Sequence, residues 1–456
     1  MPYFQSFLLN APPASEAAEP SMILAAVLLS LVVIYFASKV GGELCSRINL
    51  PPVLGELVGG VLVGVSALSL LVFPEGGIEA SQSLLMQFLQ NTAGLSPEAA
   101  PAVFATQSEV ISVLAELGVI ILLFEIGLES DLQELIKVGP QAAIVAVVGV
   151  VAPFAAGTAG LVFLFHLSTV PAIFAGAALT ATSIGITAKV LAELGQLTTK
   201  EGQIIIGAAV LDDVLGIIVL AVVASLAKTG EVQVVSTIWL IVSAGAFLIG
   251  AIIVGRLLSP LFVSLVDGMK TRGQLLTVSV VFAFVLSYIA TVIQLEAILG
   301  AFAAGLILAE TDKRGELEEQ VLPVADLFVP IFFVCVGAKT DLSVLNPAVP
   351  ANREGLIIAA FLIVVAIIGK VITGFTVFGQ DQLNKLAIGV GMIPRGEVGL
   401  VFAGVGSASG ALSESTEAAI IMMVILTTFI APPFLRLVFK EPQAAIATGE
   451  TPEKLQ

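Results

Sequence analysis

The stretch AAVLDDVLGIIVLAVV, residues 208–223, places two adjacent acids, Asp212 and Asp213, inside a run that is otherwise apolar enough to lie in a lipid bilayer. A carboxylate near the centre of a membrane helix costs about 2.5–3.5 kcal/mol on insertion scales. Acids persist in such helices where they face a cavity or a partner charge and serve a function. Asp212 and Asp213 are therefore the first candidates for a functional site.

The composition around this stretch indicates a membrane protein. Of the 456 residues, 57% are hydrophobic and 12% are charged, which leaves too few polar side chains to cover a soluble globule. Two cysteines, Cys45 and Cys335, and a single His166 are too few for a Cys/His metal site or a disulfide framework. With a net charge of −16, nucleic acid is not expected as a partner. We expect no cofactor, and we expect a transport protein rather than an enzyme.

Thirteen apolar stretches follow one another along the chain, and all but one are long enough to cross about 30 Å of hydrocarbon as a helix. They lie at residues 22–44, 53–73, 109–128, 140–165, 171–195, 201–227, 235–258, 274–294, 296–311 (the shorter one), 320–340, 355–378, 383–409 and 415–439. The sequence therefore predicts an all-α polytopic membrane protein with about thirteen transmembrane helices. Residues 22–440 would form the membrane domain, between short tails at 1–21 and 441–456.

The basic residues predict the orientation of these helices. If the N-terminus is outside, fourteen of the 19 Lys and Arg residues fall in inside loops or the C-terminal tail, and three fall outside. Lys370 and Arg395 lie within membrane stretches instead. We therefore expect the N-terminus outside and the C-terminus inside.

The thirteen predicted helices divide into two sets of six, the first to sixth and the eighth to thirteenth, which begin on opposite sides of the membrane. Inverted repeats of this kind are typical of secondary transporters. The fifth member of each set is interrupted, by TATSIGIT at 180–187 and by GMIPRGEVG at 391–399. Such breaks occur where neighbouring helices or a water-filled cavity satisfy the freed backbone groups. The sequence predicts two broken helices that meet at the midplane, although small residues can also serve close packing alone.

The acids and the first break together supply ligands for a monovalent cation. Neighbouring residues are about 100° apart on a helix, so Asp212 and Asp213 must face different partners. Hard cations prefer oxygen ligands, which a carboxylate and the hydroxyls of Thr182, Ser183 and Thr187 provide. The same carboxylate can bind a proton instead, and this competition would couple cation movement to proton movement. The alternatives are a purely structural charge cluster and a passive channel, which needs a continuous pore with repeated carbonyls or charged rings.

Seven motifs, in this order along the chain, resemble those of the monovalent cation:proton antiporter-2 family, and of its cyanobacterial members in particular. They are LPPVLGELVGGVLVG (50–64), LAELGVIILLFEIGLESDL (114–132), TATSIGITAKVLAELG (180–195), AAVLDDVLGIIVLAVV (208–223), LGAFAAGLILAE (299–310), FVPIFFVCVGAKTDL (328–342) and GMIPRGEVGLV (391–401). The resemblance implies the sodium/proton antiporter fold and a homodimer with a dimer-interface panel and a mobile core domain. It also implies elevator-like exchange of Na⁺, and of Li⁺, for H⁺ in pH and salt homeostasis.

The resemblance assigns roles to the acids and to one lysine. Asp213 falls on the principal Na⁺ ligand, Asp212 on its partner acid, and AIIGKVITGF (366–375) places Lys370 on the charge-coupling lysine. An Asp-Asp pair favours exchange that moves net charge, with Asp212 pairing with Lys370 in the cation-loaded state. Ser183 stands where some of these antiporters have a third acid, so the sequence predicts hydroxyl coordination there.

Three further charges are expected to support the core rather than bind the ion: Arg395 and Glu397, which flank the second break, and Glu125. K⁺/H⁺ exchange remains open as an alternative activity. A bacterial inner membrane and a cyanobacterial thylakoid membrane fit the sequence equally well. The expected partners are Na⁺ or another monovalent cation, H⁺, the lipid bilayer and a second copy of the chain.

Overall fold

The computed structural model describes residues 19–74, 77–229, 234–346, 350–378 and 383–439, without the side chains of a few helical residues such as Arg256 and Glu397. Within these ranges the regular elements are all helices, and no strand occurs. The prediction of an all-α membrane fold is confirmed. The tails predicted at 1–21 and 441–456 lie outside the described ranges, apart from residues 19–21.

The described part of the chain contains eight helices that are long and apolar enough to cross a membrane, together with shorter apolar helices. These eight are α2 (Pro20–Arg47), α5 (Ala100–Glu129), α6 (Leu132–Phe163), α9 (Lys200–Thr229), α11 (Gln274–Val292), α13 (Arg314–Ala338), α14 (Pro350–Gly374) and α17 (Glu414–Phe439), and α10 (Val234–Gly268) is a further long helix. The shorter helices are α3 (Pro52–Val63), α4 (Leu84–Ala93), α7 (Thr169–Ala178), α8 (Ile184–Glu193), α12 (Ala297–Ala309), α15 (Lys385–Gly391) and α16 (Glu397–Ala408). All thirteen predicted stretches contain helix, and the two interrupted stretches contain two half-helices each.

The second predicted helix, 53–73, is the largest error in the helix boundaries. α3 ends at Val63, because the chain becomes extended at Gly64 and folds back on the end of the helix. The amides of Leu70 and Leu71 both donate to the carbonyl of Val63, at 2.9 and 2.8 Å. Leu71 is apolar because it is buried in a hydrophobic cluster, not because it continues the helix. Hydropathy alone does not distinguish a buried turn from a membrane helix.

The chain forms two compact units, of which the first comprises residues up to Glu125, Met269–Val281 and Lys313–Asn346. In this unit α3 packs against both α2 and α13. A Cβ atom on Gly41 of α2 would collide with the backbone of Gly55 on α3, and the reverse also holds. Glycine at both positions therefore lets the two helix backbones touch, as small residues do in membrane helix pairs.

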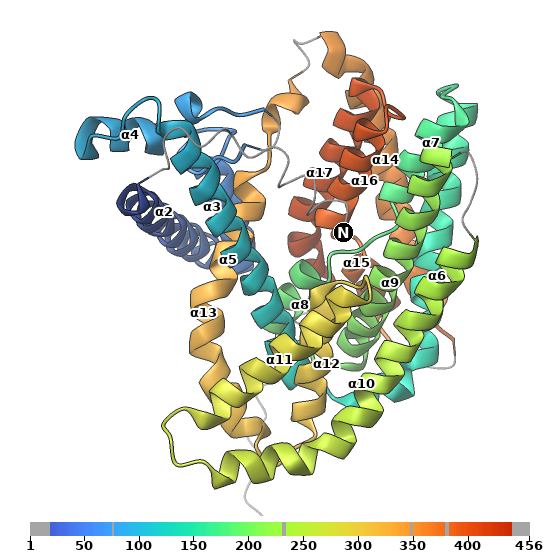
Figure 1. The fold of residues 1–456 in the computed structure, drawn as a ribbon. Coiled ribbons are helices and arrows are strands. Elements are labelled where there is room, and N and C mark those ends of the chain that lie inside the picture. The colour runs from blue at the N-terminus through green and yellow to red at the C-terminus, as the bar shows by residue number, and fades with distance from the viewer. Residues whose placement is uncertain (1–18, 75–76, 230–233, 347–349, 379–382, 440–456) are drawn as a thin grey trace, which may run out of the picture. The chain divides into compact units, whose positions relative to one another are not determined.

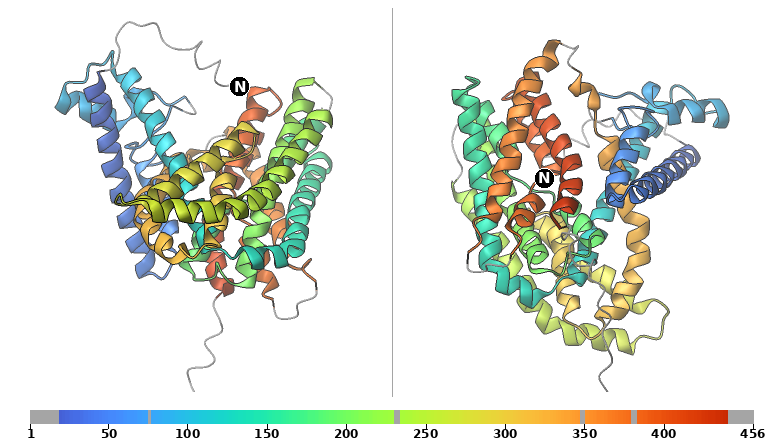
Figure 2. Two further views of the ribbon diagram at one scale, coloured as in Figure 1. Left: turned by 60° about the horizontal axis from the view of Figure 1, so that its bottom comes forward. Right: turned by 180° about the vertical axis from the view of Figure 1, so that it is seen from behind.

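The second unit comprises Ile126–Gly268, Phe282–Asp312 and the residues from Pro347 onward. In it α14 packs against both α6 and α17, and α6 packs against α9 (Figures 1 and 2). α9, which carries Asp212 and Asp213, contacts all four half-helices: α7, α8, α15 and α16. The acid pair therefore lies beside both helix breaks.

Candidate functional site

Both predicted helix breaks are present, and each consists of a short irregular segment between two half-helices. α7 ends at Ala178 and α8 begins at Ile184. α15 ends at Gly391 and α16 begins at Glu397, with Pro394 between them. Pro394 has no backbone N–H to continue a helix, which accounts for the second break. The first break coincides with the Thr/Ser-rich segment, whose hydroxyls can replace helical hydrogen bonds.

The two breaks cross and satisfy each other's polar groups. Four hydrogen bonds join them: Ser183 N to the Pro394 carbonyl (2.8 Å), Thr182 Oγ1 to the Met392 carbonyl (3.1 Å), Thr187 Oγ1 to the Gly391 carbonyl (3.0 Å), and Arg395 Nη1 to the Ala181 carbonyl (2.7 Å). In a bilayer, backbone groups freed by a broken helix must find partners within the protein. The crossing therefore holds irregular backbone at a fixed geometry next to α9.

Asp212 lies against a lysine at this crossing. The Nζ of Lys370, from α14, donates to Asp212 Oδ2 and to the Thr180 carbonyl, both at 2.7 Å. The side chains of Asp212 and Lys370 are fully buried. The contact expected between these two residues is thus present, and it links α14 both to α9 and to the first break. Its role in transport stays a prediction.

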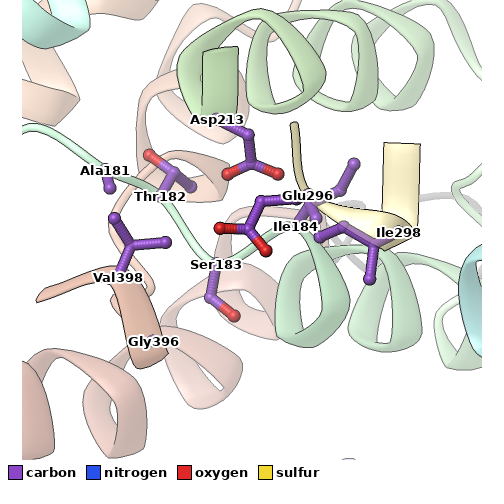
Figure 3. Close-up of a pocket in the computed structure, with 9 residues that line it drawn as sticks. All are labelled: Ala181, Thr182, Ser183, Ile184, Asp213, Glu296, Ile298, Gly396 and Val398. Atoms are coloured by element: carbon purple, nitrogen blue, oxygen red, sulfur yellow. The ribbon is translucent and has the colours of Figure 1, made fainter. Parts of the chain in front are cut away.

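Asp213 faces a different space from Asp212, as the 100° spacing along a helix requires. Its side chain is 3% exposed and lines a pocket with Thr182 and Ser183 of the first break and Gly396 of the second (Figure 3). A Cβ atom on Gly396 would lie 2.9 Å from Ser183 Oγ, so the absence of a side chain there keeps the pocket open. Carboxylate and hydroxyl oxygens thus line one cavity, and these are ligands that a hard monovalent cation can use.

Thr187 is not at this pocket. Its side chain is fully buried and donates to the Gly391 carbonyl, and it is not among the residues that line the cavity. The three hydroxyls predicted as ligands therefore separate into two at the pocket and one that fastens the crossing. Thr187 lies one helical turn beyond Ser183, on the half-helix that follows the break, so proximity in sequence did not bring it to the same space.

The structure describes the side chains of two of the three charged residues that were predicted to support the core, Arg395 and Glu125. Arg395 is fully buried, donates to the Ala181 carbonyl, and through its own carbonyl accepts from Thr428 Oγ1 at 2.5 Å. It thereby ties the first break to α16 and α17. The side chain of Glu397 lies outside the described residues. Glu125 belongs to α5 in the first unit, and its pairing with Arg395 stays a prediction.

The pocket contains an acid that sequence reasoning missed. Glu296, at the start of α12, lines the same cavity as Asp213 (Figure 3). The signal available in the sequence was an acid at the head of the short apolar stretch 296–311. An acid between two apolar segments is usually a solvated loop residue, and only the fold of α11 and α12 brings this one to the cavity.

Broken crossing helices and an acid pair within a membrane-embedded helical unit are features of ion-coupled secondary transporters. A family model described as "Sodium/hydrogen exchanger, transmembrane" matches residues 19–441. The chain belongs to this family, and it is an integral multi-pass membrane protein. The resemblance to cation:proton antiporters inferred from the motifs is thereby confirmed.

Individual relatives agree with this assignment. The chain is 74% identical over 433 residues to the high-affinity Na⁺/H⁺ antiporter NhaS3 of Synechocystis sp., a match that covers 95% of this chain and 93% of that protein. It is 32% identical to the Na⁺/H⁺-K⁺ antiporter GerN of Bacillus cereus, over 92% of this chain and 98% of that one. The solved structure of the sodium proton antiporter MjNhaP1 from Methanocaldococcus jannaschii superimposes with a TM-score of 0.60 at 16% identity, over 92% of this chain and 99% of that chain. The last likeness shows that the two chains share a fold.

Proposed function

We propose that the chain exchanges Na⁺ for H⁺ across a membrane and that Asp213 binds both ions in turn. The observation that carries this proposal is the nearly buried Asp213 carboxylate in a pocket between two broken helices. A single carboxylate offers its charge either to a cation or to a proton, so occupation by one excludes the other. The relatives NhaS3 and GerN, both named as Na⁺/H⁺ antiporters, support the same activity.

The choice between sodium and potassium rests on the relatives. The relative that is 74% identical is a Na⁺/H⁺ antiporter, whereas the name of the 32% identical one includes K⁺. Na⁺ is therefore the favoured cation, and K⁺/H⁺ exchange is the less favoured alternative. We extend the proposal to Li⁺, which is smaller than Na⁺ and prefers the same oxygen ligands.

Elevator-like movement is the mechanism that fits this site best. The residues that line the pocket all belong to the second compact unit of the chain. A site contained in one unit can be carried from one side of the membrane to the other when that unit moves as a body. We propose this movement, and a homodimer as its fixed support. We also propose an N-out/C-in orientation, a membrane domain at residues 22–440, and residence in a bacterial inner membrane or a thylakoid membrane.

Exchange can be tested with the purified full-length protein in liposomes that contain a pH-sensitive dye. A Na⁺ gradient directed inward is expected to drive protons outward and to raise the internal pH, even against an opposing proton gradient. The same concentration of K⁺ is expected to give a smaller response. Na⁺ entry that leaves the internal pH unchanged would contradict the proposal, because a passive Na⁺ pathway does not move protons uphill.

The two hydroxyls at the pocket are expected to set the affinity for the cation. Replacing a neutral ligand typically costs about 1 kcal/mol, which corresponds to about a fivefold loss of affinity. We therefore expect Thr182→Val and Ser183→Ala each to raise the Na⁺ concentration at half-maximal rate about fivefold, with the maximal rate within about twofold of wild type. Initial rates over a Na⁺ series measure both quantities.

Thr187→Val is the matched control for these variants. Thr187 lies at the same break and also donates to a backbone carbonyl, but it does not line the pocket. Its replacement is expected to lower thermal stability and to leave the Na⁺ dependence of the folded protein unchanged. If all three variants kept the wild-type Na⁺ dependence, the hydroxyls would serve packing alone.

A further inference from the structure

The turn between α11 and α12 holds Glu296 in a defined position. The chain reverses between Val292 and Ala297, with Gln294 in the left-handed region at φ 68°. Leu295 and Ile298, on either side of Glu296, are 4% and 8% exposed and anchor the backbone in the core of the unit. Glu296 itself is exposed. The buried neighbours therefore fix the position of the backbone at Glu296, while its side chain remains accessible.

The length of α12 indicates how far this turn lies from the charged segment that follows the helix. α12 has 13 residues, so at about 1.5 Å per residue it extends about 20 Å and does not cross a hydrocarbon core of about 30 Å. Its far end runs into the charged segment 310–314, which belongs at an interface. Asp213 is likewise about 20 Å along α9 from Lys200. An acid within a bilayer is costly unless it faces a cavity or a water-filled path.

The side chain of Glu296 reaches into the pocket instead of capping its own helix. Glu296 occupies the N-cap position of α12, but its side chain makes no cap hydrogen bond. In Figure 3 its carboxylate lies between the Asp213 carboxylate and the Ser183 hydroxyl. Of the nine residues that line the pocket, Asp213 and Glu296 carry charge, and both are acids. Two carboxylates therefore line the cavity, one from α9 and one from the residue before α12.

We propose that Glu296 is a second carboxylate of the ion pathway, which attracts the monovalent cation to the pocket and holds it while it loses water on its way to Asp213. The inference rests on the proposed function, since it assigns Glu296 a part in binding the same ion. Asp213 is 3% exposed whereas Glu296 is exposed, so Glu296 encloses the cation less completely and binds it more weakly than Asp213 does. Its contribution is to the apparent affinity for Na⁺, and Asp213 carries the exchanged proton.

The test compares Glu296→Gln with two control variants, all made in the full-length protein. Loss of one nearby negative charge at a partly hydrated site is expected to raise the KM for Na⁺ about fivefold and to leave kcat within about twofold of wild type. Glu296→Asp retains the charge and is expected to keep the KM near the wild-type value. Glu310→Gln removes an exposed acid at the opposite end of α12, outside the pocket, and is the matched control with unchanged kinetics.

A binding measurement separates failure of this inference from failure of the proposed function. The Na⁺ concentration at half-maximal thermal stabilisation of the detergent-purified protein reports binding without transport, and it is expected to rise in Glu296→Gln in parallel with KM. Suppose that the wild type exchanges ions, and that Glu296→Gln has an unchanged KM for Na⁺ and an unchanged Na⁺ concentration at half-maximal stabilisation. The inference is then wrong and the proposed function stands. If wild type binds Na⁺ with the expected dependence on Glu296 but does not exchange it, the proposed function is wrong and the binding role stands. Loss of kcat in a folded Glu296→Gln protein would also overturn the inference, because Glu296 would then carry the proton.

Discussion

Asp213→Asn is expected to abolish cation–proton exchange and to leave a folded protein. The amide has nearly the same shape as the carboxylate, so the crossing of the broken helices beside it is retained. It cannot bind an exchangeable proton at neutral pH, and it offers the cation a neutral oxygen instead of a charged one. Na⁺-driven proton movement in liposomes should therefore fall to the level of liposomes without protein. Size-exclusion chromatography and a thermal melt confirm that the protein is folded.

Asp312→Asn is the control for the loss of an acid as such. Asp312 is an exposed aspartate that follows α12, outside the pocket. This variant is expected to exchange Na⁺ for H⁺ at the wild-type rate. Full exchange by Asp213→Asn would show that Asp213 is not the acid that binds both ions. Glu296 would then be the next candidate for the acid that carries the proton.

Hydropathy predicted most of the fold because the bilayer imposes length and composition on each helix. It could not predict that residues 64–73 fold back on α3, because the residues of this segment that pack in the core, such as Leu71 and Phe73, are as apolar as those of a helix. The two breaks were predictable because Pro394 and the hydroxyls at 180–187 are unfavourable within a continuous helix. The partners across the breaks were not predictable, since these are backbone carbonyls of distant residues.

The site was predictable where it depends on local helix geometry. The angle between neighbouring residues required Asp212 and Asp213 to face different surroundings, and they do. Sequence reasoning placed Thr187 with the ligands and missed Glu296, because both outcomes depend on the packing of separate segments. The hydropathy pattern did show that the stretch containing α12 is short, but it did not show the turn at Gln294 that positions Glu296 at the pocket.

The buried pair of Asp212 and Lys370 is expected to respond strongly to removal of either charge. Removing one partner of a buried ion pair destabilises a protein by about 3–5 kcal/mol, because the other charge remains without compensation. Asp212 Oδ1 has no hydrogen-bond partner among the described residues, so the contact with Lys370 is the principal compensation of this carboxylate. Asp212→Asn and Lys370→Gln should each lower the melting temperature. The double variant should recover most of the loss, since it contains neither charge.

The same pair is expected to make exchange sensitive to the membrane potential. If Lys370 releases Asp212, or loses its own proton, when the ions at the site change, two protons cross for each Na⁺ and the cycle moves one net charge. An imposed potential should then drive Na⁺-dependent proton movement in wild-type liposomes. In Lys370→Gln this response to the potential should be lost. A Na⁺ gradient should still drive proton movement in this variant, since Asp213 is intact. If exchange by the wild type did not respond to the imposed potential, the charge-moving mechanism would be wrong. If exchange by Lys370→Gln still responded to it, Lys370 would have only the structural role of fastening α14 to α9 and to the first break.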